Sequence, residues 1–152
     1  MNTESNFVIL LAEDEASDAH LVKVALQENR ILADLQHVID GQEALDFVRR
    51  HGSRFAAAPR PDLILLDLNM PRMDGREFLH ALKQDQALCD IPVVILTTSQ
   101  AQRDIQSCYS LGASGFITKP IDIGQFINVI NGLSDYWIKL VHLPHHHQQQ
   151  PS

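Results

Sequence analysis

Acidic, hydroxyl and lysine side chains follow four apolar segments of the chain, and together they could carry out phosphoryl transfer. Glu13 and Asp14 follow "FVILLA", Asp67 ends "LILLD", a threonine pair ends "PVVILTT", and Lys119 ends "GFITK". Carboxylates that lie close together repel one another unless a cation lies among them, and Mg²⁺ prefers oxygen ligands. Beside such an ion and a lysine, an aspartate can act as a nucleophile and form an aspartyl phosphate. The metal and the lysine would neutralise the charge on the transferring group.

These side chains meet only if the apolar segments are strands of one sheet. Apolar runs of strand length alternate with helical patterns of hydrophobicity. Strands are predicted at residues 7–12, 34–39, 62–68, 92–98 and 115–119. Helices are predicted at about 17–28, 41–50, 76–85, 102–111 and from 123 onward. The alternation favours an α/β fold, a doubly wound parallel sheet with helices on both faces, whose ligands bind at the carboxyl ends of the strands.

The apolar pattern also predicts which surfaces are buried. Leu21, Val24 and Ala25 recur on one side of the first helix, so we expect this side to face the core. The second strand, "DLQHVI", is more polar than the others and is therefore predicted at an edge of the sheet. Residues 51–61 contain two prolines and are predicted to form a loop.

Capping signals mark three helix starts. Asp40 followed three residues later by Glu43 is typical of a capping box, and Ser99 with Gln102 repeats the pattern. Asp122 is placed to cap the last helix. These signals predict helices that begin just after a strand ends, which keeps the chemistry-bearing residues in short loops.

Composition excludes several classes of protein. The chain has 152 residues, of which 45% are hydrophobic, and this suits one domain with a substantial core. The net charge of −7 and the lack of a basic run argue against a nucleic-acid surface. Cys89 and Cys108 show no paired spacing, so reduced thiols are expected. The polar start and the short apolar run "FVILLA" predict no signal peptide and no membrane span, hence a cytoplasmic protein.

Four motifs occur in order at matching spacings: "LLAED", "LLDLNMPRMDG", "LTTS" and "FITKP". Together they resemble the receiver domain of bacterial two-component response regulators, over about residues 7–133. The resemblance implies a flavodoxin-like fold with a five-stranded parallel sheet of order 2-1-3-4-5. It also implies a signalling protein that catalyses only its own phosphoryl transfer and dephosphorylation, rather than an enzyme acting on other substrates.

The resemblance further implies a phosphoacceptor and a metal site. Asp67 would be the phosphoacceptor and would also contact Mg²⁺ or Mn²⁺. Asp14 would bind the ion directly, with Glu13 assisting. Asn69 would offer its backbone carbonyl to the ion.

The same resemblance assigns the switch. Thr97 would hydrogen-bond the phosphoryl group and report its presence, and Lys119 would pair with a phosphoryl oxygen. The Lys119–Pro120 bond is expected to be cis. Phe116 falls at the family's switch aromatic, although a ring that only packs in the core would give the same sequence.

The C-terminal part narrows the resemblance and suggests partners. The extended "LSDYWIKLVHLP" and the phosphoacceptor motif are similar to single-domain regulators that partner bacterial and cyanobacterial phytochromes. This implies a sensor histidine kinase, of phytochrome type, as phosphoryl donor. After Leu143 too few residues remain for an output module, so the output would be contact with a phosphotransfer or target protein.

The end of the chain predicts a dimer contact and a tail. Tyr136, Trp137 and Leu140 lie past the end of a minimal receiver and would leave apolar surface for a homodimer. Packing of this segment back on the same molecule is the alternative. Residues 1–143 are thus predicted to form one receiver domain with an extension from about 134, and the histidine- and glutamine-rich 144–152 a disordered tail without assigned function.

Two other functions fit the sequence less well. A phosphatase working through an aspartyl phosphate would place a second aspartate two residues after the nucleophile, but Asn69 stands there and cannot transfer a proton. A receiver-like scaffold that is never phosphorylated would be expected to lose acidic or lysine residues of the site, and this chain keeps them. Phosphorylation-switched signalling is therefore favoured over both.

Overall fold

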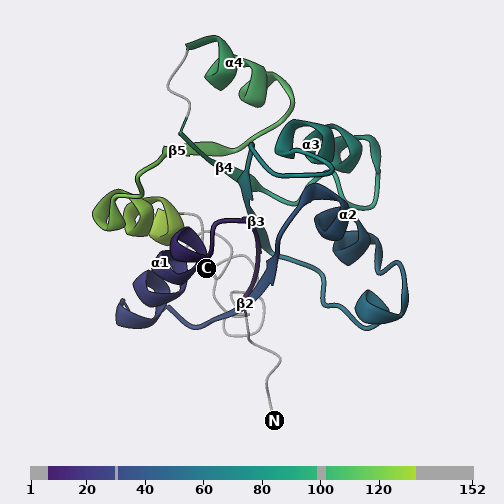
Figure 1. Cartoon of the computed structure of the whole chain (residues 1–152), viewed down its shortest axis with the longest axis horizontal. Helices are drawn as coiled ribbons and strands as arrows, with labels where there is room; N and C mark the ends of the chain where they lie inside the picture. The colour runs from purple at the N-terminus through teal and green to yellow at the C-terminus, as the bar shows by residue number, and fades with distance from the viewer. Residues whose placement is uncertain (1–6, 30, 99–101, 133–152) are drawn as a thin grey trace, which may run out of the picture.

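The sheet is as predicted. The computed structural model describes residues 7–29, 31–98 and 102–132 (Figure 1). Its strands are β1 Phe7–Ala12, β2 Ala33–Val38, β3 Leu63–Asp67, β4 Val93–Thr97 and β5 Gly115–Thr118. They pair in parallel in the order β2-β1-β3-β4-β5, which confirms the predicted topology and the edge position of β2.

Helices cover both faces of the sheet. They are α1 Ala16–Glu28, α2 Gly41–Arg49, α3 Gly75–Gln84 and α4 Gln102–Ser110, followed by a last helix at 123–132. In Figure 1, α1 and the last helix lie on one side of the strands, and α2 and α3 lie on the other. Side chains alternate along the strands, so that Leu10 packs into the α2–α3 core while Ile9 and Leu11 pack into the α1 core.

The predicted inner side of α1 is confirmed for Ala25 and wrong for Leu21 and Val24. The buried residues of the helix are Ala19, Val22, Ala25 and Leu26, whereas Leu21 and Val24 are only partly buried. Apolar residues occur around most of this helix, so their spacing alone does not fix one side. Packing against the sheet determines that the side centred on Val22 is buried.

Three local features differ from expectation. Asp40 caps α2 as predicted, but the Glu43 carboxylate accepts a hydrogen bond from the Ile39 N–H, not from that of Asp40. A complete capping box, which was not predicted, starts α3 with Asp74 and Glu77. The 51–61 loop contains a short 3₁₀ helix, η1 Ser53–Phe55, whose last residue is buried.

Some predictions lie outside the described residues. These are the Ser99–Gln102 capping pair, because Ser99 is not described, the dimer surface of Tyr136, Trp137 and Leu140, and the tail 144–152. The cap at Asp122 is observed, since its carboxylate accepts a hydrogen bond from the Gln125 N–H. Among the helices within the described ranges, none is long and apolar enough to cross a membrane.

Candidate functional site

The carboxyl ends of the strands bring the predicted side chains together. Glu13 follows β1, Asp67 ends β3, Thr97 ends β4 and Lys119 follows β5. The parallel register aligns these ends, and the Lys119 N–H donates to the Thr97 carbonyl at 2.7 Å. All four residues are buried, with exposures of 0%, 3%, 0% and 9%. Sheet hydrogen bonding thus places them at one edge.

Lys119 lies among three carboxylates. Its Nζ is 2.8 Å from Glu13 Oε1, 3.1 Å from Asp18 Oδ2 and 3.5 Å from Asp67 Oδ2. Its bond to Pro120 is cis, as predicted. Asp18 was not among the predicted site residues, although it lies in the first turn of a helix that begins at the same edge.

Burial and charge shift the pKa values of this group in opposite directions. Burial raises the pKa of Glu13 to about 7, the nearby Asp67 carboxylate adds to the rise, and Lys119 opposes it. Burial lowers the pKa of Lys119, but its contacts with Glu13, Asp67 and Asp18 outweigh burial and leave it raised. Lys119 is therefore a cation at this edge, while the pKa of Glu13 is raised to about 7.

The acidic residues fit a divalent cation. Glu13, Asp14 and Asp67 each offer a carboxylate oxygen, and these oxygens lie within 4.8 Å of one another. Glu13 Oε1 is buried and forms an ion pair with Lys119 Nζ at 2.8 Å. Asp14 is exposed, so the cluster opens to solvent. A buried carboxylate oxygen beside two further carboxylates suits a hard cation such as Mg²⁺ or Mn²⁺.

The other predicted residues surround this group. The Asn69 N–H donates to Asp67 Oδ1 at 3.2 Å, which places Asn69 beside the phosphoacceptor candidate. Phe116 pairs with Ile95 across β4 and β5 and packs, half-buried, against the α2–α3 core. Both the switch and the packing roles of Phe116 remain compatible with this position.

This fold is that of a receiver domain. A model of the response regulator receiver domain family matches residues 9–131, and the chain belongs to this family.

Among relatives, the chain is 40% identical over 146 residues to response regulator Rcp1 of Synechocystis sp., covering 95% of this chain and 99% of Rcp1. The phosphorylated cyanobacterial phytochrome response regulator RcpA has a similar structure, with a TM-score of 0.76, 40% identity and coverage of 88% of this chain and 94% of RcpA. The Mn²⁺-bound form of Rcp1 matches with a TM-score of 0.71 and 39% identity, over 87% of this chain and 94% of that one. The chain is thus a receiver similar to phytochrome response regulators, consistent with phosphoryl acceptance in two-component signalling.

Proposed function

We propose that Asp67 accepts a phosphoryl group from a phosphohistidine of a sensor kinase. The observation that supports this most directly is a buried carboxylate at a strand end, with a lysine ammonium 3.5 Å away. An Asp67 carboxylate oxygen would attack phosphorus, and the P–N bond would break with its electron pair going to the imidazole nitrogen. Lys119 would then donate to a phosphoryl oxygen, and Thr97 would contact the same group.

The metal in this proposal is Mg²⁺, or Mn²⁺ in its place. Glu13, Asp14 and Asp67 would hold it through carboxylate oxygens, and Asn69 through its backbone carbonyl. When bound, the ion supplies positive charge that offsets the crowded carboxylates and the phosphoryl oxygens. Because the pKa of Glu13 is raised without an ion, metal binding would favour its ionised form.

The output would be a change in protein contacts. Contacts made by Thr97 to the phosphoryl group, together with the position of Phe116, would shift the population of the α4–β5 face toward a partner-binding state. The segment with Tyr136, Trp137 and Leu140 would supply a homodimer contact. A phosphotransfer or target protein in the cytoplasm would read the result, because phosphotransfer from a kinase takes place there.

The kinase would be of the phytochrome type. This part rests on the likeness to RcpA, which is described as a cyanobacterial phytochrome response regulator, and on the comparable likeness to Rcp1. In a pair of kinase and receiver, the acidic cluster of the receiver must be accessible to the donor histidine. Here the cluster is open to solvent at Asp14.

The test is phosphorylation with acetyl phosphate, read as intact mass, with Mg²⁺ and with a chelator. We expect one added phosphoryl group on the wild type, lost with chelator and in Asp67→Asn. Asp90→Asn is the matched control, since this exposed acid pairs with Arg60 away from the site. Equal labelling of Asp67→Asn would overturn the assignment. No labelling from acetyl phosphate or from a phosphorylated phytochrome-type kinase would favour the unphosphorylated scaffold.

A further inference from the structure

One buried carboxylate is not used by the proposed phosphoryl chemistry. Asp40, in the loop between β2 and α2, is 3% exposed. Its Oδ1 accepts a hydrogen bond from the Glu43 N–H at 2.8 Å and so caps α2. A cap alone does not require burial, since serine, threonine and asparagine serve as well at exposed helix ends. The burial of this charge points to a further partner.

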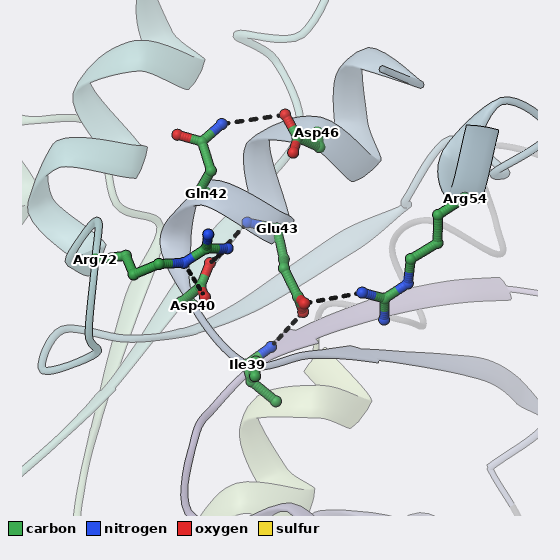
Figure 2. Close-up of polar contacts among 7 residues, drawn as sticks. All are labelled: Ile39, Asp40, Gln42, Glu43, Asp46, Arg54 and Arg72. Carbon is green, nitrogen blue, oxygen red and sulfur yellow. Dashed lines mark hydrogen bonds and ion pairs between the residues drawn. The ribbon is translucent and has the colours of Figure 1, made fainter. Parts of the chain in front are cut away.

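That partner is Arg72, from the loop between β3 and α3. Its Nε donates to Asp40 Oδ2 at 2.8 Å and its Nη2 to Oδ1 at 3.1 Å, as Figure 2 shows. The two parallel contacts make a bidentate guanidinium–carboxylate pair, which fixes direction as well as distance. Arg72 itself has a φ of 64°, in the left-handed region, so the loop adopts a specific conformation at the contact.

The loop is held close to α2 by its backbone as well. The Gly41 N–H donates to the Met73 carbonyl at 2.8 Å. A Cβ atom on Gly41 would lie 2.3 Å from the same carbonyl oxygen, so glycine is required for the approach. Residues 72 and 73 are therefore attached to the start of α2 through one side-chain pair and one backbone bond.

The other end of this loop is the candidate site. The loop leaves β3 at Asp67 and passes Asn69, and it returns at Gly75, whose N–H donates to the Leu68 carbonyl at 3.0 Å. A Cβ atom on Gly75 would lie 2.4 Å from the Asp67 carbonyl oxygen. In a short loop packed this closely at both ends, we expect a displacement of Arg72 to move Asn69 as well.

We propose that Asp40 and Arg72 are positioning residues for the metal site, because their pair holds the β3–α3 loop in the conformation that presents the Asn69 carbonyl. This deepens the function proposed above and rests on it. Without the pair the loop would populate other conformations, and the apparent metal affinity would fall in proportion to the competent fraction. Loss of such supporting contacts weakens metal binding by about 10-fold or more, and we expect the lower end because the Arg72 side chain is 59% exposed.

The test is Mn²⁺ binding followed by electron paramagnetic resonance of the free ion, on the full chain. Asp40→Ser keeps a capping oxygen and removes the carboxylate, and Arg72→Ala removes the guanidinium. We expect each to weaken Mn²⁺ binding about tenfold, and the double variant to be no weaker than either single one. Arg72→Lys should resemble Arg72→Ala, because an ammonium cannot make the bidentate contact. Circular dichroism would show that the variants are folded, with Arg72→Lys as the mildest change.

Arg54→Ala is the matched control. It removes another arginine–carboxylate pair at the same end of α2, the 2.8 Å contact with Glu43, without touching the β3–α3 loop (Figure 2). Its Mn²⁺ affinity should equal that of the wild type. Unchanged affinity in Arg72→Ala, additive losses in the double variant, or a wild type that binds no Mn²⁺ would each overturn the positioning role.

Phosphorylation measured in parallel separates this proposal from the proposed function. At saturating Mg²⁺ the variants at Asp40 and Arg72 should approach the wild-type rate, while half-maximal rate should need about tenfold more metal. If the wild type binds Mn²⁺ and the variants bind it more weakly, but Asp67 is never labelled, the positioning role stands and the phosphoacceptor assignment fails. If Asp67 is labelled with equal metal dependence in all variants, the phosphoacceptor assignment stands and the positioning role fails.

Discussion

Replacing Glu13 by glutamine should remove a pH-dependent loss of stability from the metal-free protein. Burial raises the pKa of Glu13 from 4.5 to about 7 in the folded state, while the unfolded chain retains the lower value. Between these two values the folded protein holds one more proton than the unfolded chain, so the free energy of unfolding falls as pH rises. At 1.36 kcal/mol per pKa unit the loss reaches about 3 kcal/mol by pH 8.

Urea unfolding in chelator at pH 5, 6, 7 and 8, followed by circular dichroism, measures this directly. The wild type should lose more stability between pH 5 and 8 than Glu13→Gln, by about 2.5 kcal/mol, because part of the loss occurs below pH 5. The lowered pKa of Asp40 and the raised pKa of Lys119 have their effects outside this window, below pH 4 and above pH 10. Parallel pH profiles of stability for the two proteins would refute the idea that ionisation of Glu13 destabilises the folded protein.

The same contacts support three further predictions. In differential scanning calorimetry, Mg²⁺ at about 100 times its Kd should stabilise the wild type by about 2.7 kcal/mol. At a fixed Mg²⁺ concentration this gain in stability should be larger at pH 8 than at pH 6, because Glu13 must lose its proton to bind the ion. An equal gain at both pH values would contradict this. Gly75→Ala should lower the free energy of unfolding by about 1–3 kcal/mol in urea and slow labelling by acetyl phosphate, since its Cβ would lie 2.4 Å from the Asp67 carbonyl oxygen. Wild-type stability and labelling would show that the loop can move to accommodate the methyl group. Phe55→Ala should lose about 3 kcal/mol of stability, because its buried ring packs edge-on against Phe47 at 5.5 Å, but should keep the labelling rate at saturating Mg²⁺; a slower rate would link the 51–61 loop to the site.

Residues whose positions are set by the strands could be predicted from the sequence. Asp67, Thr97 and Lys119 follow apolar runs that are unmistakable, and a parallel sheet brings the ends of such runs to one edge whatever the loops do. The prediction failed for two of the three residues of α1, because apolar residues lie around most of the helix and only contact with the sheet selects the side that Val22 occupies. Asp18 was also missed, because its contact with Lys119 joins segments 101 residues apart and leaves no local pattern.

Asp40 illustrates the same limit within one side chain. Its capping role could be predicted, since a helix start depends on neighbours three residues away. Its pairing with Arg72 could not, because 32 residues and a whole strand separate the two. The sequence around Asp40 and the sequence around Arg72 each lack a pattern that would predict contact between the two loops.

The strand ends are held by hydrogen bonds of the sheet and the loops by side-chain contacts, so the two parts of the site should respond differently to substitution. Lys119 and Thr97 are held by the sheet itself, through a backbone bond of 2.7 Å, so exchanging their side chains alters the chemistry without displacing the chain. Asn69 lies instead in the β3–α3 loop, between the buried Leu68 and Met70, and in our proposal it also depends on the contacts of this loop with α2. A buried carboxylate there is costly unless it is paired. Asp40 is paired both by the Glu43 N–H and by Arg72, so we expect the burial of this charge and the conformation of the loop to be coupled.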